Sequence, residues 1–234
     1  MFIVVLPSHN VGKCDYIERS LKKEGVATIF VVPDDTSVKH NPLESASGLF
    51  ITGDGYHTAD HGWGVRDLSL VNQALELDVP VLATGLGVFL LNQAFGGKFP
   101  RSVVGHAINQ GVEGNATSLH TIYISPGSKS AAILGLGGFF KVNSRHAMGI
   151  SELQRSPRLL ASAYSVEDGV IEGLESPEHS WVIGFQANIE RQNEAPKLFR
   201  NIFLAFLDRV EGFSRNRPTF SQRIGPTNSE TEIG

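Results

Sequence analysis

The chain has 234 residues, of which 41% are hydrophobic and 19% are charged, and its formal net charge is −4. That length and composition allow one sizeable core in a single domain, and the weak negative charge disfavours nucleic acid and anionic membranes as partners. With one cysteine, neither an internal disulfide framework nor a cysteine-based zinc site is expected.

The sequence carries no sign of a membrane segment or of export. No apolar run reaches the roughly 18 residues that a membrane-spanning helix needs. The first ten residues, MFIVVLPSHN, lack the basic segment and cleavage site of a signal peptide and predict a first strand. We therefore expect a cytoplasmic protein that does not bind a membrane.

Apolar stretches and helical patterns alternate along the first part of the chain. Residues 2–6, 27–32 and 48–52 are apolar runs, typical of strands buried on both faces of a parallel sheet. Residues 15–24 and 66–77 have the apolar periodicity of amphipathic helices. This alternation predicts an α/β fold with a doubly wound, mostly parallel sheet flanked by helices.

The stretch from 79 to 97 predicts a strand, a sharp turn and a helix. Residues 79–83 form a short apolar strand, 84–87 a glycine-containing turn, and 88–94 a helix apolar enough to pack on the sheet. This is the arrangement of a nucleophile elbow, in which one strained residue projects its side chain at the top of a sheet. The residue at the apex is Gly85, which has no side chain and offers no nucleophile.

These residues resemble the class I glutamine amidotransferase superfamily, and most of all its gamma-glutamyl-gamma-aminobutyrate hydrolase (peptidase C26-like) branch. That branch reads P-V-L-G-I-C-R-G-M-Q-x-L-N-x-x-x-G-G at its elbow, where this chain reads PVLATGLGVFLLNQAFGG. Gly85 stands at the position of the catalytic Cys, and Leu86 at the position of the Arg. The resemblance implies a flavodoxin-like α/β fold with a small antiparallel addition.

Two later segments carry the same resemblance. The chain reads VNSRHAM at 142–148, where the family has V-N-S-x-H-H-Q. It reads WVIGFQANIE at 181–190, where the family has W-x-x-G-x-Q-x-H-P-E and the His is the catalytic base. Asn188 replaces that His, while Glu190, the third member of the triad, is retained. The resemblance covers residues 2 to about 210 of the chain.

The resemblance also implies which residues line the pocket. The oxyanion-hole positions correspond to Gly53 and Asp54 after the third strand and to Leu86 in the elbow. A carboxylate at position 54 would oppose oxyanion stabilisation, unless Asp54 only caps a turn. Ser144 and His146 match a segment that borders the substrate pocket in the family.

Two of the three triad positions are therefore lost, and an Asn amide cannot serve as a general base. We expect a catalytically degenerate protein that needs no cofactor and binds a small gamma-glutamyl or amino-acid-like ligand or a partner protein. Homodimer formation is a further expectation, and no nucleic acid partner is expected.

Two other interpretations stay open. The chain could be an active hydrolase or amidotransferase that uses Cys14, which precedes a predicted helix N-terminus where a thiolate is stabilised. A weaker variant uses Thr84 or Ser144 with His146 as base. Alternatively, the protein is a structural or oligomer-forming subunit whose pocket is filled by apolar side chains such as Leu86.

The remaining signals concern metal binding and the end of the chain. His57, Asp60 and His61 have a spacing that suits metal ligands on a helix, but the flanking glycines favour a polar loop, so no metal site is expected. An apolar face at 195–210 predicts a last helix. Residues 1–211 are expected to form one domain, followed by a polar, flexible tail at 212–234.

Overall fold

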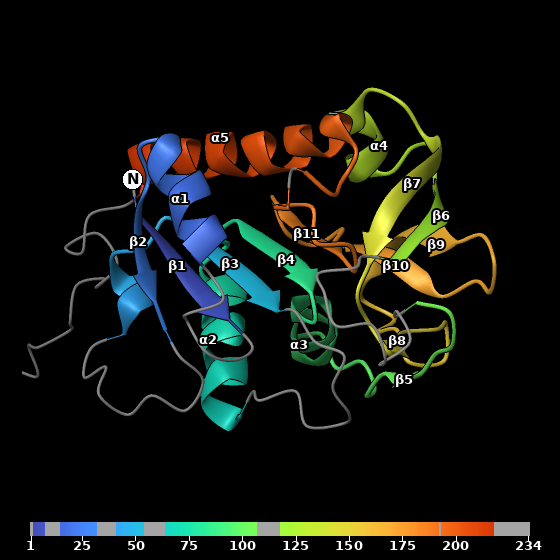
Figure 1. Ribbon diagram of the computed structural model, residues 1–234. Coiled ribbons are helices and arrows are strands. Elements are labelled where there is room, and N and C mark those ends of the chain that lie inside the picture. Colours follow the sequence, from blue (N-terminus) through green and yellow to red (C-terminus); the bar gives the residue numbers. More distant parts are fainter. Residues whose placement is uncertain are drawn as a thin grey trace, which may run out of the picture.

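The computed structural model of the protein describes residues 2–7, 15–31, 41–53, 64–106, 118–191 and 193–217. Within those residues, one large sheet has the strand order β2-β1-β3-β4-β11-β10-β9-β6-β7 (Figure 1). A short pair, β5 (Arg101–Ser102) with β8 (Met148–Gly149), lies outside it. The α/β fold class expected from the sequence is confirmed.

One half of the sheet is parallel. Its strands are β1 (Phe2–Pro7), β2 (Ala27–Phe30), β3 (Gly48–Gly53), β4 (Val81–Gly85) and β11 (Val182–Phe185). Every residue of β3, β4 and β11 is buried, as the continuous apolar runs predict. The register pairs Thr52 with Thr84 and Gly53 with Gly85, so β3 and β4 end at the same level.

The other half of the sheet is antiparallel. It contains β10 (Ile171–Glu175), β9 (Leu160–Ser165), β6 (Ser118–Ile124) and β7 (Gly138–Ser144). This part is larger than the small addition that the sequence predicts. The reason is that β10, β9, β6 and β7 continue outward from β11 as successive partners, which alternating patterns along the chain do not reveal.

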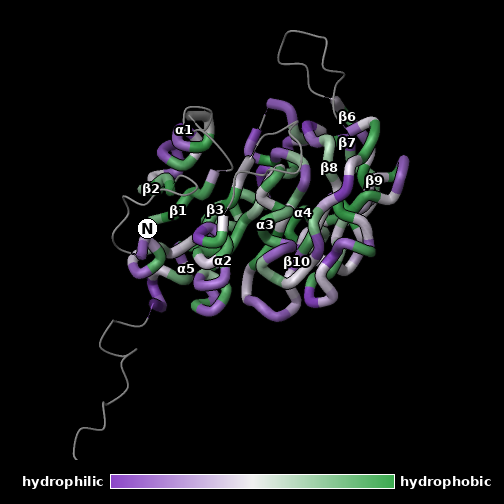
Figure 2. Tube along the Cα trace, turned by 90° about the horizontal axis from the view of Figure 1, so that it is seen from below, coloured by the Kyte–Doolittle hydropathy of each residue, from purple (hydrophilic) through white to green (hydrophobic). Residues whose placement is uncertain are grey.

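Helices cover both faces of the sheet, as a doubly wound fold requires (Figures 1 and 2). One face is covered by α1 (Asp15–Lys23), α4 (Lys129–Leu134), α5 (Arg200–Asn216) and the turn η3 (Lys197–Phe199). The opposite face is covered by α2 (Val65–Glu76), α3 (Gly87–Ala94) and the turn η2 (Pro42–Glu44). No helix in the described part of the chain is both long and apolar enough to span a membrane.

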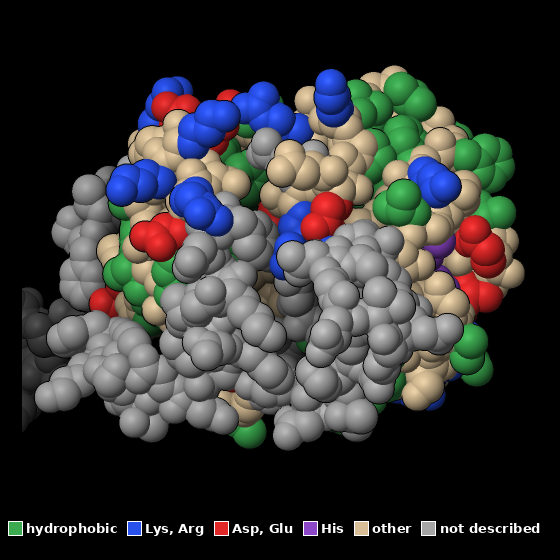
Figure 3. Space-filling view, viewed as in Figure 1, with side chains coloured by type: hydrophobic (Ala, Val, Ile, Leu, Met, Phe, Trp, Pro, Cys, Tyr) green, Lys and Arg blue, Asp and Glu red, His purple; other side chains and the backbone are tan. Residues whose placement is uncertain are grey.

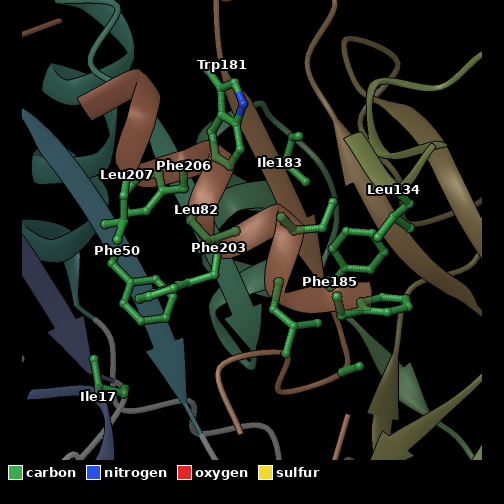
Figure 4. Packing of buried hydrophobic residues seen from close by; sticks show 14 of the residues in the cluster. Ile17, Phe50, Leu82, Leu134, Trp181, Ile183, Phe185, Phe203, Phe206 and Leu207 are labelled. Atoms are coloured by element: carbon green, nitrogen blue, oxygen red, sulfur yellow. The ribbon is translucent and has the colours of Figure 1, made fainter. Parts of the chain in front are cut away.

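An aromatic cluster holds α5 on the parallel strands (Figure 4). The ring of Phe50, in β3, has its centroid 6.3 Å from those of Phe203 and Phe206, and Trp181 lies 5.4 Å from Phe206. Phe50 and Phe206 are fully buried. A Cβ added to Gly48 would lie 2.4 Å from a methyl group of Val210, so the helix approaches the strand closely where there is no side chain.

The last helix is longer than the sequence predicts. It continues to Asn216, although the flexible tail was expected from residue 212. Two contacts explain the extension, because Phe213 is partly buried against the core and the Arg217 guanidinium donates hydrogen bonds to the carbonyls of Ala46 (2.8 Å) and Leu43 (2.6 Å). The rest of the expected tail, 218–234, lies outside the described residues.

Removal of the Phe206 ring tests this packing. Because Phe206 is fully buried, we expect Phe206→Ala to lower the free energy of unfolding by about 3–5 kcal/mol in urea denaturation. Phe99 is 70% exposed, so Phe99→Ala should change it by about 0.5 kcal/mol or less. Equal losses in the two variants would contradict the packing of α5.

Candidate functional site

The carboxyl ends of three neighbouring parallel strands meet at one edge of the sheet. Gly53 ends β3, Gly85 ends β4, and Asn188 and Glu190 follow β11, which pairs with β4. In open α/β sheets this edge is where ligands bind. The structure therefore brings together the triad positions that the sequence resemblance assigns to Gly85, Asn188 and Glu190.

A chain of buried hydrogen bonds holds Glu190 in place. Its Oε1 accepts hydrogen bonds from Asn188 Nδ2 (3.0 Å) and Thr52 Oγ1 (3.2 Å). Thr84 Oγ1 donates in turn to Thr52 Oγ1 at 3.1 Å. Thr84 is therefore engaged with β3 and Glu190, and no contact with His146 supports it as a nucleophile.

Asn143 clamps the backbone of Asn188. Its Oδ1 accepts from the Asn188 N–H at 2.9 Å, and its Nδ2 donates to the Asn188 carbonyl at 3.0 Å. Both side chains are buried. This pair joins the end of β7, in the antiparallel half, to the segment after β11. Sequence reasoning treated Asn143 only as a match to the family motif, because its partner lies far away along the chain.

The apex of the elbow has no room for a side chain. Gly85 has φ = +56°, and an added Cβ would lie 2.1 Å from the Gly53 carbonyl oxygen and 2.8 Å from Asn188 Nδ2. The Leu86 N–H, which the resemblance assigns to the oxyanion hole, donates to that same carbonyl at 2.9 Å. The Gly53 carbonyl thus fills the space that a nucleophilic side chain would need. It also accepts the N–H of Leu86, which would otherwise be an oxyanion donor.

The other residues expected in the pocket do not gather around Gly85, or they lie outside the described part of the chain, except for Leu86. Ser144 Oγ donates to the His106 carbonyl at 2.6 Å, and His146 lies among other histidines, so neither belongs to the group around Gly85. Leu86 is buried. Cys14, Asp54 and the 57–61 loop lie outside the described residues.

A second buried polar group lies in the antiparallel half. It consists of His120 in β6, Glu172 in β10, His146 after β7 and His106 after β5, and all four are buried. One ligand atom from each lies within 4.8 Å of the others. Sequence reasoning missed this group, although a His on the buried face of β6 and a Glu in the apolar stretch of β10 were signals of it.

The charges in this second group depend on one another. Burial alone would raise the pKa of Glu172, but the charge of His146 and contacts with the three histidines bring it well below its ordinary value. For His106, burial alone would lower the pKa, but hydrogen bonds and charge interactions with Glu172 and Asp168 outweigh burial and raise the pKa above its ordinary value. His106 Nε2 lies 3.0 Å from Asp168 Oδ2.

A cleft of about 510 Å³ opens beside Glu190. It is lined by side chains of α1 and of the segment after β11: Arg19, Ser20, Lys23, Glu190, Arg191, Asn193 and Glu194. Figure 3 shows basic side chains over α1 on this face of the molecule. Glu194 is held by the Arg145 guanidinium, with N–O distances of 2.9 to 3.1 Å. The cleft therefore offers cations and carboxylates together.

The Peptidase C26 family model matches residues 8–188. The chain belongs to the Peptidase C26 family. Rv2859c of Mycobacterium tuberculosis, assigned to the glutamine amidotransferases, is 30% identical over 219 residues, which covers 86% of this chain and 68% of that protein. The gamma-glutamyl-gamma-aminobutyrate hydrolase PuuD of Escherichia coli is 29% identical over 157 residues, 64% of this chain and 61% of the enzyme.

A solved structure supports the same fold. The glutamine amidotransferase of Methylobacillus flagellatus superposes with a TM-score of 0.63 at 19% sequence identity, covering 87% of this chain and 74% of that one. The family model and the relatives confirm the superfamily expected from the elbow and the later motifs, and this structure supports the fold.

The crowding at Gly85 can be measured with a matched pair of variants. Gly96 also has a positive φ (+82°), but nothing lies within 4 Å of its added Cβ. Both Gly85→Ala and Gly96→Ala meet the left-handed penalty of about 1–2 kcal/mol. Gly85→Ala should lose about 1–3 kcal/mol more in chemical denaturation, because its methyl group overlaps the Gly53 carbonyl. Equal losses would mean that the turn is open.

Proposed function

We propose that this protein is a catalytically degenerate member of the Peptidase C26 family that acts by binding a small gamma-glutamyl or amino-acid-like ligand. The observation that carries the proposal is the position of the Gly53 carbonyl, 2.1 Å from where a Cβ of residue 85 would lie. A cysteine thiol has no place there, and Leu86 has no N–H left for an oxyanion.

The chemistry of the remaining groups supports the absence of amidase activity. Covalent amide hydrolysis needs a nucleophile beside a base that takes its proton. Gly85 has no side chain, and the Asn188 amide Nδ2 donates a hydrogen bond to Glu190 Oε1 at 3.0 Å. Thr84, the hydroxyl at the neighbouring position, donates to Thr52.

The cleft beside Glu190 supports binding of an amino-acid head group. Arg19 and Lys23 on one wall suit a carboxylate. On the other wall, the Glu190 and Glu194 carboxylates already accept from Asn188 and Arg145 and have further acceptor positions for an ammonium group. A gamma-glutamyl compound carries both an ammonium group and a carboxylate group on its α-carbon. The name of the E. coli relative, a gamma-glutamyl-gamma-aminobutyrate hydrolase, points to the same class of compound.

Calorimetric titration tests the binding. We expect the protein to bind gamma-glutamyl-gamma-aminobutyrate or glutamine with one site per chain. Arg19→Ala/Lys23→Ala should weaken the affinity at least about tenfold, because a hydrogen bond to a charged group contributes about 1.5–3 kcal/mol.

The control is Arg158→Ala, whose guanidinium pairs with Glu178 away from the cleft, and which should bind as the native chain does. Absence of binding at millimolar concentrations would refute the ligand proposal. It would favour a structural or oligomer-forming subunit, an interpretation that the closed turn at Leu86 also suits. Light scattering would then show whether the chain assembles.

An activity assay addresses catalysis separately. Release of ammonia from glutamine, or of the amine from gamma-glutamyl amides, should not exceed the uncatalysed rate. We expect Gly85→Cys/Asn188→His to remain inactive as well, because the new side chain meets the Gly53 carbonyl.

Turnover by the native chain would refute catalytic degeneracy. If Cys14→Ser then abolished that turnover, Cys14 would be the nucleophile of an active hydrolase. Turnover by the double variant alone would show that the backbone at Gly53 moves aside.

A further inference from the structure

We propose that His106, His120, His146 and Glu172 bind one divalent transition-metal ion, best suited to Zn²⁺, in a closed structural site. The four side chains come from β6, β10 and the segments after β5 and β7. They are between 1% and 7% exposed. The proposal is independent of the ligand proposed for the cleft beside Glu190.

The contacts between Glu172 and the three histidines have the length expected between neighbouring ligands of a tetrahedral metal site. Glu172 Oε1 lies 3.4 Å from His106 Nδ1 and 3.5 Å from His146 Nε2, and Glu172 Oε2 lies 3.5 Å from His120 Nε2. Metal–ligand bonds of about 2.1 Å place neighbouring ligand atoms of a tetrahedron about 3.4 Å apart. Imidazolium–carboxylate hydrogen bonds would instead contract to about 2.7–2.9 Å.

Outer hydrogen bonds orient two of the histidines. His146 Nδ1 lies 2.8 Å from the Met148 carbonyl, which can only accept, so Nδ1 carries the proton. His106 Nε2 lies 3.0 Å from Asp168 Oδ2 and donates to it in the same way. In the neutral rings, the lone pairs of His106 Nδ1 and His146 Nε2 then face Glu172. A carboxylate or carbonyl behind each ligating histidine is the usual second layer of a metal site.

Six buried polar atoms of this cluster lack hydrogen-bond partners in the described part of the chain. His106 Nδ1, both nitrogens of His120, His146 Nε2 and both oxygens of Glu172 are buried without a hydrogen bond from any described residue. Buried polar groups in proteins are almost always hydrogen-bonded or bind an ion. Five of these atoms, one nitrogen of each histidine and both Glu172 oxygens, converge within one small volume and therefore point to a ligand that accepts lone pairs.

The donor set selects the class of metal. Three imidazoles and one carboxylate suit Zn²⁺, Cu²⁺, Ni²⁺ and Fe²⁺, whereas Mg²⁺ and Ca²⁺ prefer oxygen ligands alone. Four protein ligands leave no open coordination position, which is typical of structural zinc. The ion would link β6, β10 and the end of β7 close to Asn143, which clamps Asn188.

Metal titration of the chelator-treated native chain tests the proposal. We expect Zn²⁺ to bind with one ion per chain and to raise the unfolding temperature in a concentration-dependent way. X-ray absorption at the zinc edge should show three imidazoles and one oxygen ligand at about 2.0–2.2 Å. This measurement uses the native chain and needs no variant to fold.

Matched variants assign the site. Glu172→Gln keeps the size of the side chain and should weaken Zn²⁺ binding at least about 100-fold, since it removes the anionic ligand. His179→Asn is a control, because the His179 ring contacts Ser176 at 2.8 Å outside the cluster. The double variant His57→Asn/His61→Asn is a control for the histidines of the 57–61 loop. Both this variant and His179→Asn should bind Zn²⁺ as tightly as the native chain does.

Three results would overturn the proposal. The first is absence of stoichiometric Zn²⁺ binding together with an unchanged unfolding temperature, which would identify a protonated histidine–glutamate cluster. The second is an absorption spectrum with fewer than three imidazoles. The third is loss of binding in His57→Asn/His61→Asn with full binding in Glu172→Gln.

Discussion

The hydrogen bond from the Leu86 N–H to the Gly53 carbonyl determines the shape of the turn between β4 and α3. It is made possible by glycine at position 85, where φ is positive and any side chain would strike that carbonyl. A second close approach occurs at Gly87, whose added Cβ would lie 2.5 Å from the Ile51 carbonyl. The elbow thus keeps the backbone of a nucleophile turn while its contacts exclude the nucleophile.

Glu190, which stands at a triad position by the sequence resemblance, has structural partners here. The Glu190 carboxylate accepts hydrogen bonds from Asn188 and from Thr52, and Thr52 in turn accepts one from Thr84. The carboxylate therefore links β3, β4 and the segment after β11. Asn143 adds two bonds from the antiparallel half. Because these groups are buried and mutually hydrogen-bonded, losing one leaves the others unsatisfied, so the network stabilises the fold whether or not it takes part in chemistry.

The two polar centres have different surroundings. The cleft beside Glu190 is open and mixes cations with carboxylates, which suits a reversible, charged ligand. The group around Glu172 is enclosed, and its polar atoms face one another. An open, charged cleft at the parallel edge therefore contrasts with an enclosed polar cluster in the antiparallel half.

The sequence by itself determined the fold class and the elbow, and it predicted which residues stand at the triad positions. Those features depend on neighbours along the chain: apolar runs predict strands, and Gly85 or Asn188 can be read directly within their motifs. The length of α5 and the size of the antiparallel half could not be read in this way, since Arg217 and β7 are placed by partners far away in the chain.

Only the tertiary structure decided how separate segments meet. Strand register brings the Gly53 carbonyl against Gly85. The pairing of β6 with β9, and of β9 with β10, brings His120 towards Glu172, although no spacing in the sequence connects them. The physical reason is that hydrogen bonds within a sheet and packing across it set these distances, and both act between residues whose separation along the chain carries no periodic signal.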